Sequence, residues 1–308
     1  MTTLYITHED CLGHATPVGH PERPDRLRAV WERTSGPDFD ALKREEAQEA
    51  SPDMAELAHP ASYVDRIRAA APKEGLVRVD ADTSMSPGSW RAVMLGVGAA
   101  VRGVDAVLGK EADNVFCATR PPGHHAERTT AMGFCLFNNA AIAAYHAREQ
   151  HGLKRVAVVD FDVHHGNGTQ DIFWSDRDMF YGSTHQMPLY PGTGAVTETG
   201  VGNIFNAPLR PGAGGDHFRL AMEERILPAL SAFSPELLIV SAGFDAHRRD
   251  PLAELNFVEE DFAWATRRLM EVADEACEGR VVSILEGGYD LEGLASSAAA
   301  HVRELMRA

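Results

Sequence analysis

The chain has 308 residues, of which 44% are hydrophobic and 24% are charged, and its formal net charge is −16. One α/β domain is the first expectation at this length. The negative charge argues against nucleic acid as a partner, because neutralising phosphates needs a basic patch.

The four cysteines are widely spaced and form no CxxC pair, which indicates a reducing compartment and argues against disulfides and a thiolate zinc site. The N-terminus lacks a basic region followed by an apolar core, and no apolar run is long enough to cross a bilayer. A cytoplasmic protein without a membrane partner is expected, and a homo-oligomer is left open.

Strand and helix patterns alternate along the chain. Short apolar runs predict strands at residues 4–7, 115–118, 156–159, 179–184, 203–209, 237–242 and 281–285. Apolar residues at helical spacing predict helices that begin near residue 24 and near residue 291 and that cover 53–57, 61–70, 86–107, 138–150, 169–174, 217–233 and 258–277. This alternation predicts a single α/β domain, residues 1–308, with a central, mostly parallel sheet and right-handed crossovers.

Two connections are rich in polar side chains. The loop 8–24 carries three histidines together with Glu22 and Arg23, and it either lines a site or is a solvated connection. The stretch 73–85 is expected to be a polar connection in which Asp80 and Asp82 lie close together.

The most informative stretch is 155–168. A continuous apolar run, 156–159, predicts a strand covered on both faces, and Asp160, Asp162, His164 and His165 crowd its carboxyl end. Side chains alternate along an extended segment, so the first three share one side and His165 points to the other. Carboxylates and imidazoles so placed suit a divalent cation such as zinc, although an acidic surface loop is the simpler alternative.

Three other strands finish in polar, glycine-containing turns. These turns carry His124 and His125, Asp245, and Tyr289 between flanking glycines and Asp290. In a parallel sheet such ends lie on one edge, where ligands bind. Taken singly, each motif is weak, because paired histidines are often solvated, an aspartate after a strand often caps a helix, and Gly-Gly-Tyr often forms only a turn.

Together, these residues predict metal-assisted amide hydrolysis. Three protein ligands, Asp162, His164 and Asp245, leave positions for water and substrate, as in catalytic zinc sites. His125 is the expected general base, and either His124 or His125 would protonate the leaving amine. Two further side chains, Asp160 and Asn167, are expected to orient the two imidazoles. Tyr289 would donate to the tetrahedral oxyanion.

The motifs resemble the zinc-dependent histone deacetylase family. They are, in chain order, Arg120-Pro-Pro-Gly-His-His, Gly133-Phe-Cys-Leu-Phe-Asn-Asn, Asp160-Phe-Asp-Val-His-His-Gly-Asn-Gly, Tyr190-Pro-Gly-Thr-Gly, Ser241-Ala-Gly-Phe-Asp and Leu285-Glu-Gly-Gly-Tyr. Asn167 resembles class II, which includes bacterial histone deacetylase-like amidohydrolases. The resemblance implies an arginase-like α/β fold with an eight-stranded, mostly parallel sheet and helices on both faces.

The resemblance also implies ligands and a substrate tunnel. Zn²⁺ would be held by Asp162, His164 and Asp245, with His124, His125 and Tyr289 catalytic. Phe134, after Gly133, and Tyr190 fall where the family has the aromatic walls of a narrow acyl-lysine tunnel, with simple core packing as the alternative. A structural K⁺ near the zinc would use the family positions occupied here by Asp160, Asp162, His164, Ser183 and Thr184.

Two positions bear on activity and substrate. Tyr289 is present where poorly active class IIa members have histidine, so a competent deacetylase is expected. Leu252 falls where the polyamine-selective class II relative carries glutamate, so a cationic acetylpolyamine would lose its partner at the tunnel mouth. This favours peptide or small-molecule acyl-lysine-like substrates over acetylpolyamines.

Two rival functions remain to be weighed. A binuclear-manganese ureohydrolase shares the fold, but His247 stands where its second aspartate would be expected. A non-catalytic acyl-lysine-binding scaffold would not need the proton-transfer pair and the tyrosine.

Overall fold

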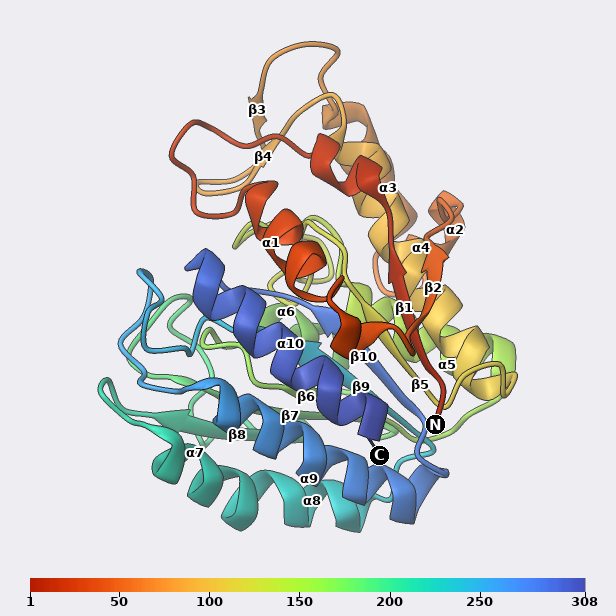
Figure 1. The fold of residues 1–308 in the computed structure, drawn as a ribbon. Coiled ribbons are helices and arrows are strands. Elements are labelled where there is room, and N and C mark those ends of the chain that lie inside the picture. The colour runs from red at the N-terminus through yellow and green to blue at the C-terminus, as the bar shows by residue number, and fades with distance from the viewer. Residues whose placement is uncertain (308) are drawn as a thin grey trace.

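A parallel eight-stranded sheet runs through the centre of the computed structural model, which describes residues 1–307 (Figure 1). In spatial order its strands are β2 (Lys43–Glu46), β1 (Thr3–Thr7), β5 (Asn114–Cys117), β10 (Val281–Leu285), β9 (Leu237–Ala242), β6 (Val156–Asp160), β7 (Met179–Gln186) and β8 (Ile204–Leu209). All neighbouring strands in this sheet pair in parallel. A small antiparallel pair, β3 (Val77–Arg78) and β4 (Ser84–Met85), lies apart from it.

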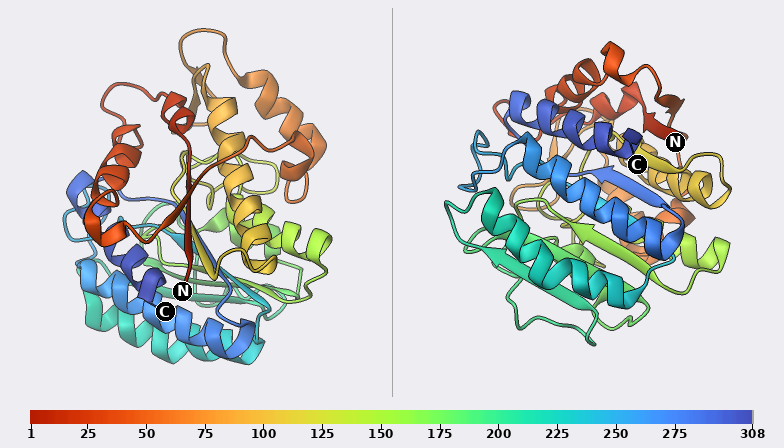
Figure 2. Two further views of the ribbon diagram at one scale, coloured as in Figure 1. Left: turned by 45° about the vertical axis from the view of Figure 1, so that its right-hand side comes forward. Right: turned by 60° about the horizontal axis from the view of Figure 1, so that its bottom comes forward.

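Helices cover both faces of the sheet (Figures 1 and 2). One layer contains α4 (Ser89–Leu108), α5 (Asn139–His151) and α6 (Asn167–Phe173). The other contains α1 (Asp25–Arg33), α7 (Gly215–Ala221), α8 (Leu227–Phe233), α9 (Glu259–Cys277) and α10 (Leu291–Arg307). The other helical elements before α4 are η1 (Glu9–Gly13), η2 (Pro37–Phe39), α2 (Pro52–Ala55) and α3 (Ala61–Ala70). The predicted α/β fold class is confirmed.

The central strands are dry, as their continuous apolar runs predict. Residues 156–159 have no exposed surface, and the same holds for Leu237, Leu238 and Ile239 of β9. Because both faces of these strands are buried, their residues are apolar throughout and do not alternate with polar ones, as they would in a sheet with one face in solvent. Polar side chains therefore gather where the strands end.

The strand β2 was not predicted from its own residues, Lys43-Arg-Glu-Glu. It is an edge strand, paired on one side with β1, and three of its four residues are exposed. Edge strands commonly carry charges that discourage pairing with other chains. Such a strand lacks the apolar pattern by which strands are recognised, which is why only seven strands of the sheet were predicted.

The prediction of one continuous α-helix over 217–233 was wrong, because the helix is interrupted. A π-helical turn, Met222–Ile226, separates α7 from α8. Pro228 stands in the first turn of α8 and lacks the backbone N–H that a continuous α-helix would need there. A wider turn accommodates this missing hydrogen bond.

The start of α5 fits the capping signals in the sequence. The Oδ1 atom of Asn138 accepts a hydrogen bond from the backbone N–H of Ala141 at 2.9 Å. Gly152 ends the helix with a φ of +72°, which glycine adopts without strain. These caps fix the helix that follows the loop carrying His124 and Phe134.

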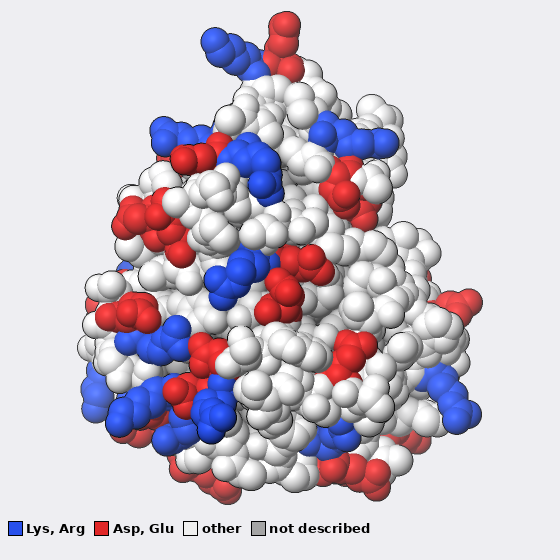
Figure 3. Space-filling model, turned by 180° about the vertical axis from the view of Figure 1, so that it is seen from behind, with Lys and Arg blue, Asp and Glu red and all other residues white. Residues whose placement is uncertain are grey.

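The outer surface carries charges of both signs. Lysine and arginine side chains lie intermixed with aspartate and glutamate on the face seen from behind (Figure 3). Surface ion pairs of the chain include Arg102 with Glu45 and Arg148 with Asp176. Among residues 1–307, none of the helices combines the length and apolar character that a membrane crossing requires.

Helix α4 supplies a test of backbone packing. A Cβ atom on Gly98 would lie 1.8 Å from the backbone oxygen of Gln48, whereas one on Gly96 would find its nearest neighbour at an ordinary 3.4 Å. We expect Gly98→Ala to lower the free energy of unfolding by about 1–3 kcal/mol through overpacking. Gly96→Ala, the matched control, should be neutral or stabilising by up to about 1 kcal/mol, because alanine favours a helix. Denaturant unfolding of both variants checks this; equal stabilities would contradict it.

Candidate active site

The four strands that carry the predicted site residues lie side by side in the sheet, in the order β5, β10, β9 and β6. Because all four are parallel, their carboxyl ends share one edge. The loops that follow them carry His124 and His125, Tyr289, Asp245, and Asp162 with His164, in that spatial order. The topology therefore brings together residues up to 165 positions apart in sequence.

Asp162, His164 and Asp245 form a tight cluster with a ligand atom from each within 4.8 Å of the others. Nδ1 of His164 lies 3.2 Å from Oδ1 of Asp162 and 3.1 Å from Oδ2 of Asp245. Both carboxylates are fully buried, and His164 is 7% exposed. Two buried carboxylates and an imidazole at such distances fit a divalent cation, because a cation offsets negative charge that burial alone would penalise.

Two glycines make room for these carboxylates. A Cβ atom on Gly243 would lie 2.0 Å from Oδ2 of Asp162, and one on Gly287 would lie 2.1 Å from Oδ2 of Asp245. The backbone N–H of Gly287 also donates to Oδ2 of Asp162 at 2.8 Å. The Gly-Phe-Asp and Glu-Gly-Gly-Tyr segments thus provide space as well as side chains.

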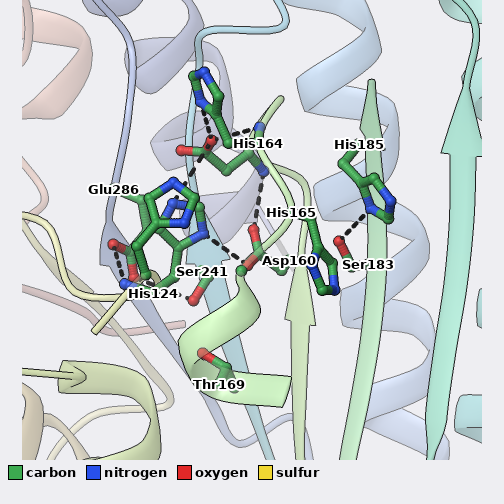
Figure 4. A network of polar contacts seen from close by, with 12 residues as sticks. His124, Asp160, His164, His165, Thr169, Ser183, His185, Ser241 and Glu286 are labelled. Carbon is green, nitrogen blue, oxygen red and sulfur yellow. Dashed lines mark hydrogen bonds and ion pairs between the residues drawn. The ribbon is translucent and has the colours of Figure 1, made fainter. Parts of the chain in front are cut away.

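His124 is held by a buried carboxylate. Its Nδ1 donates to Oδ2 of Asp160 at 2.9 Å, and the hydroxyl of Tyr181 donates to the same oxygen at 3.0 Å. Burial alone would lower the pKa of His124, but the carboxylates of Asp162 and Asp160 raise it well above its usual range. Figure 4 shows His124 and Asp160 facing each other, with Glu286 on the other side of the imidazole.

His125 is held by a neutral amide, which fixes its tautomer. The Nδ2 group of Asn167 donates to Glu127 at 2.8 Å, so Oδ1 of Asn167 faces Nδ1 of His125 at 2.8 Å. That oxygen can only accept, so Nδ1 carries the proton and Nε2 is left as the acceptor. Burial, with repulsion from His124, lowers the pKa of His125 well below its usual range. The pKa values of the two adjacent histidines are therefore shifted in opposite directions, that of His124 upwards and that of His125 downwards.

Tyr289 is positioned through its backbone and its ring. Its N–H donates to Oδ2 of Asp250 at 2.7 Å, its ring lies 5.9 Å from that of Phe134, and the guanidinium carbon of Arg26 lies 4.9 Å from its ring centroid. Burial, with Asp245 adding to it, raises the pKa of Asp250 to about 7. Asp250 thus holds the backbone of Tyr289, and Arg26 and Phe134 contact its ring.

Behind this loop lies a buried ion cluster built on Glu22. Arg120 donates to both carboxylate oxygens of Glu22, at 2.8 and 2.6 Å, and Arg26 donates to one of them at 3.1 Å. Arg26 also donates to the backbone oxygens of Gly288, at 2.6 Å, and Glu286, at 2.5 Å. Glu22 is fully buried and both arginines are 1% exposed. Part of the 8–24 loop therefore supports the Tyr289 loop and is not simply a solvated connection.

A cavity of about 250 Å³ leads to the cluster. The four predicted tunnel residues, Gly133, Phe134, Tyr190 and Leu252, all line it. The other lining residues are Asp82, Leu189 and three of the predicted site residues, His125, His164 and Tyr289. Gly133 has a φ of +55°, and a Cβ there would lie 2.4 Å from the ring of His125. The backbone of Gly133 therefore packs directly against the ring of His125, and a residue with a side chain would not fit at this position.

The residues suggested for potassium lie beside the Asp162–His164–Asp245 cluster. Asp160 of β6 pairs in register with Ser183 of β7, and Thr184 follows it. The Ser183 hydroxyl lies 2.9 Å from Nδ1 of His185, and the Thr184 hydroxyl is buried without a hydrogen-bond partner within the described chain. A buried hydroxyl oxygen without a hydrogen-bond partner fits a hard cation, which prefers oxygen ligands.

His165 lies on the other side of this stretch, as alternation along the chain predicts. Its Nδ1 lies 2.7 Å from the Thr193 hydroxyl, its Nε2 lies 3.1 Å from Oε1 of Gln170, and its ring packs 4.8 Å from His185. Figure 4 shows it next to Ser183 and His185. Its contacts are with the 190–194 loop, α6 and β7, and it does not line the cavity.

Several supporting residues were missed by sequence reasoning. Glu286 accepts hydrogen bonds from the backbone N–H groups of Gly123 and His124, at 2.6 and 3.1 Å, and burial raises its pKa to about 7. Asp250, Glu127 and Arg26 were likewise assigned no role. Glu286 lies inside the quoted Leu285-Glu-Gly-Gly-Tyr motif and Asp250 lies two residues before Leu252, so their positions were a usable signal. Nothing in the sequence pairs Glu22 with Arg120, 98 positions away.

His247 takes no part in the cluster. It is buried, and its Nε2 lies 3.7 Å from Glu259 of α9. Position 247 therefore does not supply the second metal-bridging carboxylate that a binuclear ureohydrolase would need.

The fold and the site define an α/β protein with a buried Asp–His–Asp cluster at the foot of a narrow cavity. A family model described as "Histone deacetylase domain" matches residues 20–305. The rice (Oryza sativa subsp. japonica) "Histone deacetylase 10, chloroplastic" is 42% identical over 318 residues, 96% of this chain and 71% of that protein. The "Histone deacetylase-like amidohydrolase" of Pseudomonas aeruginosa is 38% identical over 310 residues, 93% and 81% of the two chains.

A solved structure agrees with these sequences. The crystal structure of the HDA15 HD domain superposes with a TM-score of 0.93 at 35% identity, covering 98% of this chain and 88% of that one. The chain belongs to the histone deacetylase family, whose members named here include deacetylases and amidohydrolases. The predicted family is thus confirmed.

The Glu22 cluster yields a test of stability. Removing one partner of a buried ion pair leaves uncompensated charge, so we expect Glu22→Gln to lower the free energy of unfolding by about 3–5 kcal/mol. Glu45→Gln, which weakens the partly exposed pair with Arg102, is the control and should cost less than about 1 kcal/mol. Denaturant unfolding of both proteins decides; a Glu22→Gln protein as stable as the control would contradict the role given to the cluster.

Proposed function

We propose that the protein is a zinc-dependent amidohydrolase that removes acetyl or another short acyl group from acylated lysine-like amines. The main support is that His125, His164 and Tyr289 line one narrow cavity, with the buried Asp162–His164–Asp245 cluster at its foot. Membership of the histone deacetylase family supports hydrolysis of this kind.

Asp162, His164 and Asp245 would hold the zinc. Their donor set of two carboxylates and one imidazole fits zinc, and the space left by Gly243 and Gly287 fits carboxylates turned towards one ion. Zinc in such a site acts as a Lewis acid and lowers the pKa of a water molecule. A potassium ion is proposed beside it, on Asp160, Asp162, His164, Ser183 and Thr184, where the buried Thr184 hydroxyl lacks a partner.

The protein's own groups divide the proton transfers. His125 has a free Nε2 acceptor because Asn167 holds the proton at Nδ1, so it serves as the general base towards water in the cavity. His124, held by Asp160, lies behind it with a ring-centroid separation of 4.0 Å. After bond cleavage the leaving amine takes a proton from the histidine pair. Tyr289 would donate its hydroxyl proton in a hydrogen bond to the carbonyl oxygen as negative charge develops there.

The cavity supports a substrate whose amine side is a linear, largely apolar chain. The rings of Phe134 and Tyr190 line it, and Tyr190 packs edge-on against His125 at 5.2 Å between centroids. Leu252 adds an apolar side chain to the same wall. A cavity lined by aromatic and apolar side chains suits a methylene chain, which favours acyl-lysine-like amines.

The role of Tyr289 can be isolated by removing one oxygen atom. We expect Tyr289→Phe to keep the metal, because Tyr289 is no ligand, and to lower kcat about 10²- to 10³-fold, as loss of an oxyanion donor does. Steady-state kinetics on an acetyl-lysine peptide, together with zinc content, measure both. Phe134→Leu serves as a control for cavity packing and should act mainly on KM. A kcat for Tyr289→Phe equal to that of the wild type would remove the tyrosine from the reaction.

Leu252 tests the substrate class. A glutamate at this cavity position would attract a cationic amine, so Leu252→Glu should raise kcat/KM for acetylated polyamines relative to acetyl-lysine peptides by about tenfold. Leu252→Gln, similar in size but neutral, is the control and should leave the ratio near that of the wild type. If both variants shift the ratio equally, charge at position 252 does not select the substrate.

The proposal as a whole is tested by turnover. Zinc-loaded protein should hydrolyse acetyl-lysine peptides, lose activity on chelation and regain it with zinc. A parallel panel of longer acyl-lysines and acetylated polyamines ranks the substrates. Tight binding of acyl-lysine without product would instead identify a scaffold protein, and turnover of polyamines alone would identify an acetylpolyamine amidohydrolase.

A further inference from the structure

A second cluster of metal-ligating side chains joins α4 to α5. Asp105 belongs to α4, and His146 and His151 belong to α5, which packs along it (Figures 1 and 2). One ligand atom from each lies within 4.8 Å of the others. Among residues 1–307, this cluster and Asp162–His164–Asp245 are the two groups of histidine, cysteine, aspartate or glutamate that meet this condition.

The donor atoms of the second cluster already converge. Oδ1 of Asp105 lies 2.7 Å from Nε2 of His146 and 2.7 Å from Nε2 of His151. The two imidazole rings lie 5.6 Å apart at 74° to each other. Bonds of about 2.0–2.1 Å to a tetrahedral ion place donors about 3.3 Å apart, so roughly 0.6 Å of opening suffices. The Asp105 side chain is 41% exposed and can make that movement.

The charges at this place favour a cation. Within the described chain, the ion-pair contacts of Asp105 are with these two histidines, which are cationic only when protonated. The adjacent Arg102 of α4 is engaged with Glu45 and Glu111. With neutral imidazoles the carboxylate keeps its charge, on a protein of net charge −16 that attracts cations generally.

The position separates this cluster from the catalytic one. Helix α5 begins beside the His124 loop, since a Cβ on Gly123 would lie 2.7 Å from the backbone nitrogen of Asn139, and His151 is its last residue. A helix of 13 residues is about 20 Å long. The Asp162–His164–Asp245 cluster therefore lies at the carboxyl ends of the strands, and the second cluster lies towards their amino ends.

We propose that Asp105, His146 and His151 form a second metal site that binds a divalent transition cation of the zinc, nickel or copper class. Two imidazoles select such ions over Mg²⁺ and Ca²⁺, which prefer oxygen ligands. Half-exposure of Asp105 and His151 leaves the remaining coordination positions to water. An ion held by both helices ties the C-terminal part of α4 to the end of α5. Its effect is on stability, and the chemistry in the cavity does not depend on it.

Zinc stoichiometry tests the proposal. Protein loaded with one equivalent of zinc is titrated with further Zn²⁺ by calorimetry, and wild type should take up a second equivalent. Asp105→Asn and His151→Ala should weaken that second binding event at least tenfold and leave acetyl-lysine turnover unchanged. Saturating zinc should raise the Tm of the wild type by about 5 °C, and this rise should be lost in both variants.

Two control variants separate the sites. His217→Ala removes an exposed histidine of α7 and should keep both equivalents. Asp245→Ala should lose the catalytic equivalent and keep the second, so the outcome does not depend on the proposed function. A wild type that binds one equivalent only overturns the proposal, as does a second equivalent that survives in both Asp105→Asn and His151→Ala.

Discussion

The burial of several carboxylates at one sheet edge is the constraint on which the site depends. Asp160, Asp162, Asp245 and Glu286 are at most 1% exposed and lie within a few residues of strand ends. Like charges so close and so dry cannot coexist without donors or a cation. Backbone N–H groups supply part of the compensation: Val163 donates to Asp245 at 2.8 Å, and His164 donates to Asp162 at 2.9 Å. The two histidines, the glycine-lined space and the candidate metal position follow from the same requirement.

This constraint explains why the neighbouring histidines differ. His124 faces a carboxylate and is drawn towards the charged form, whereas His125 faces an amide and is held neutral by burial and by its neighbour. Two imidazoles in contact cannot both be charged in a dry site. A single difference between their partners, Asp160 for His124 and Asn167 for His125, therefore gives two neighbouring imidazoles different protonation states.

Sequence reasoning was strongest where a motif and a strand end coincide. The buried run 156–159 predicts both the strand and the place of Asp162 and His164, and the parallel topology brings Asp245 and Tyr289 to them. It failed where partners are distant or patterns are absent. The charged edge strand β2 has no apolar period, and the Glu22–Arg120 pair has no local signal. The cluster on α4 and α5 joins residues 41 positions apart, and its histidines are spaced by five residues, off the four-residue repeat that aligns side chains on a helix.

The position of β10 has a consequence for the growing polypeptide. This strand, residues 281–285, is the last in the chain, yet it lies between β5 and β9 in the middle of the sheet. During synthesis the two halves of the sheet cannot join until nearly the whole chain has left the ribosome. The space around Asp162 and Asp245 is closed only when Gly287 arrives. Closure of the space around these carboxylates and completion of the fold are thus late and simultaneous events, so a nascent or truncated chain leaves the carboxylates of Asp162 and Asp245 exposed to water.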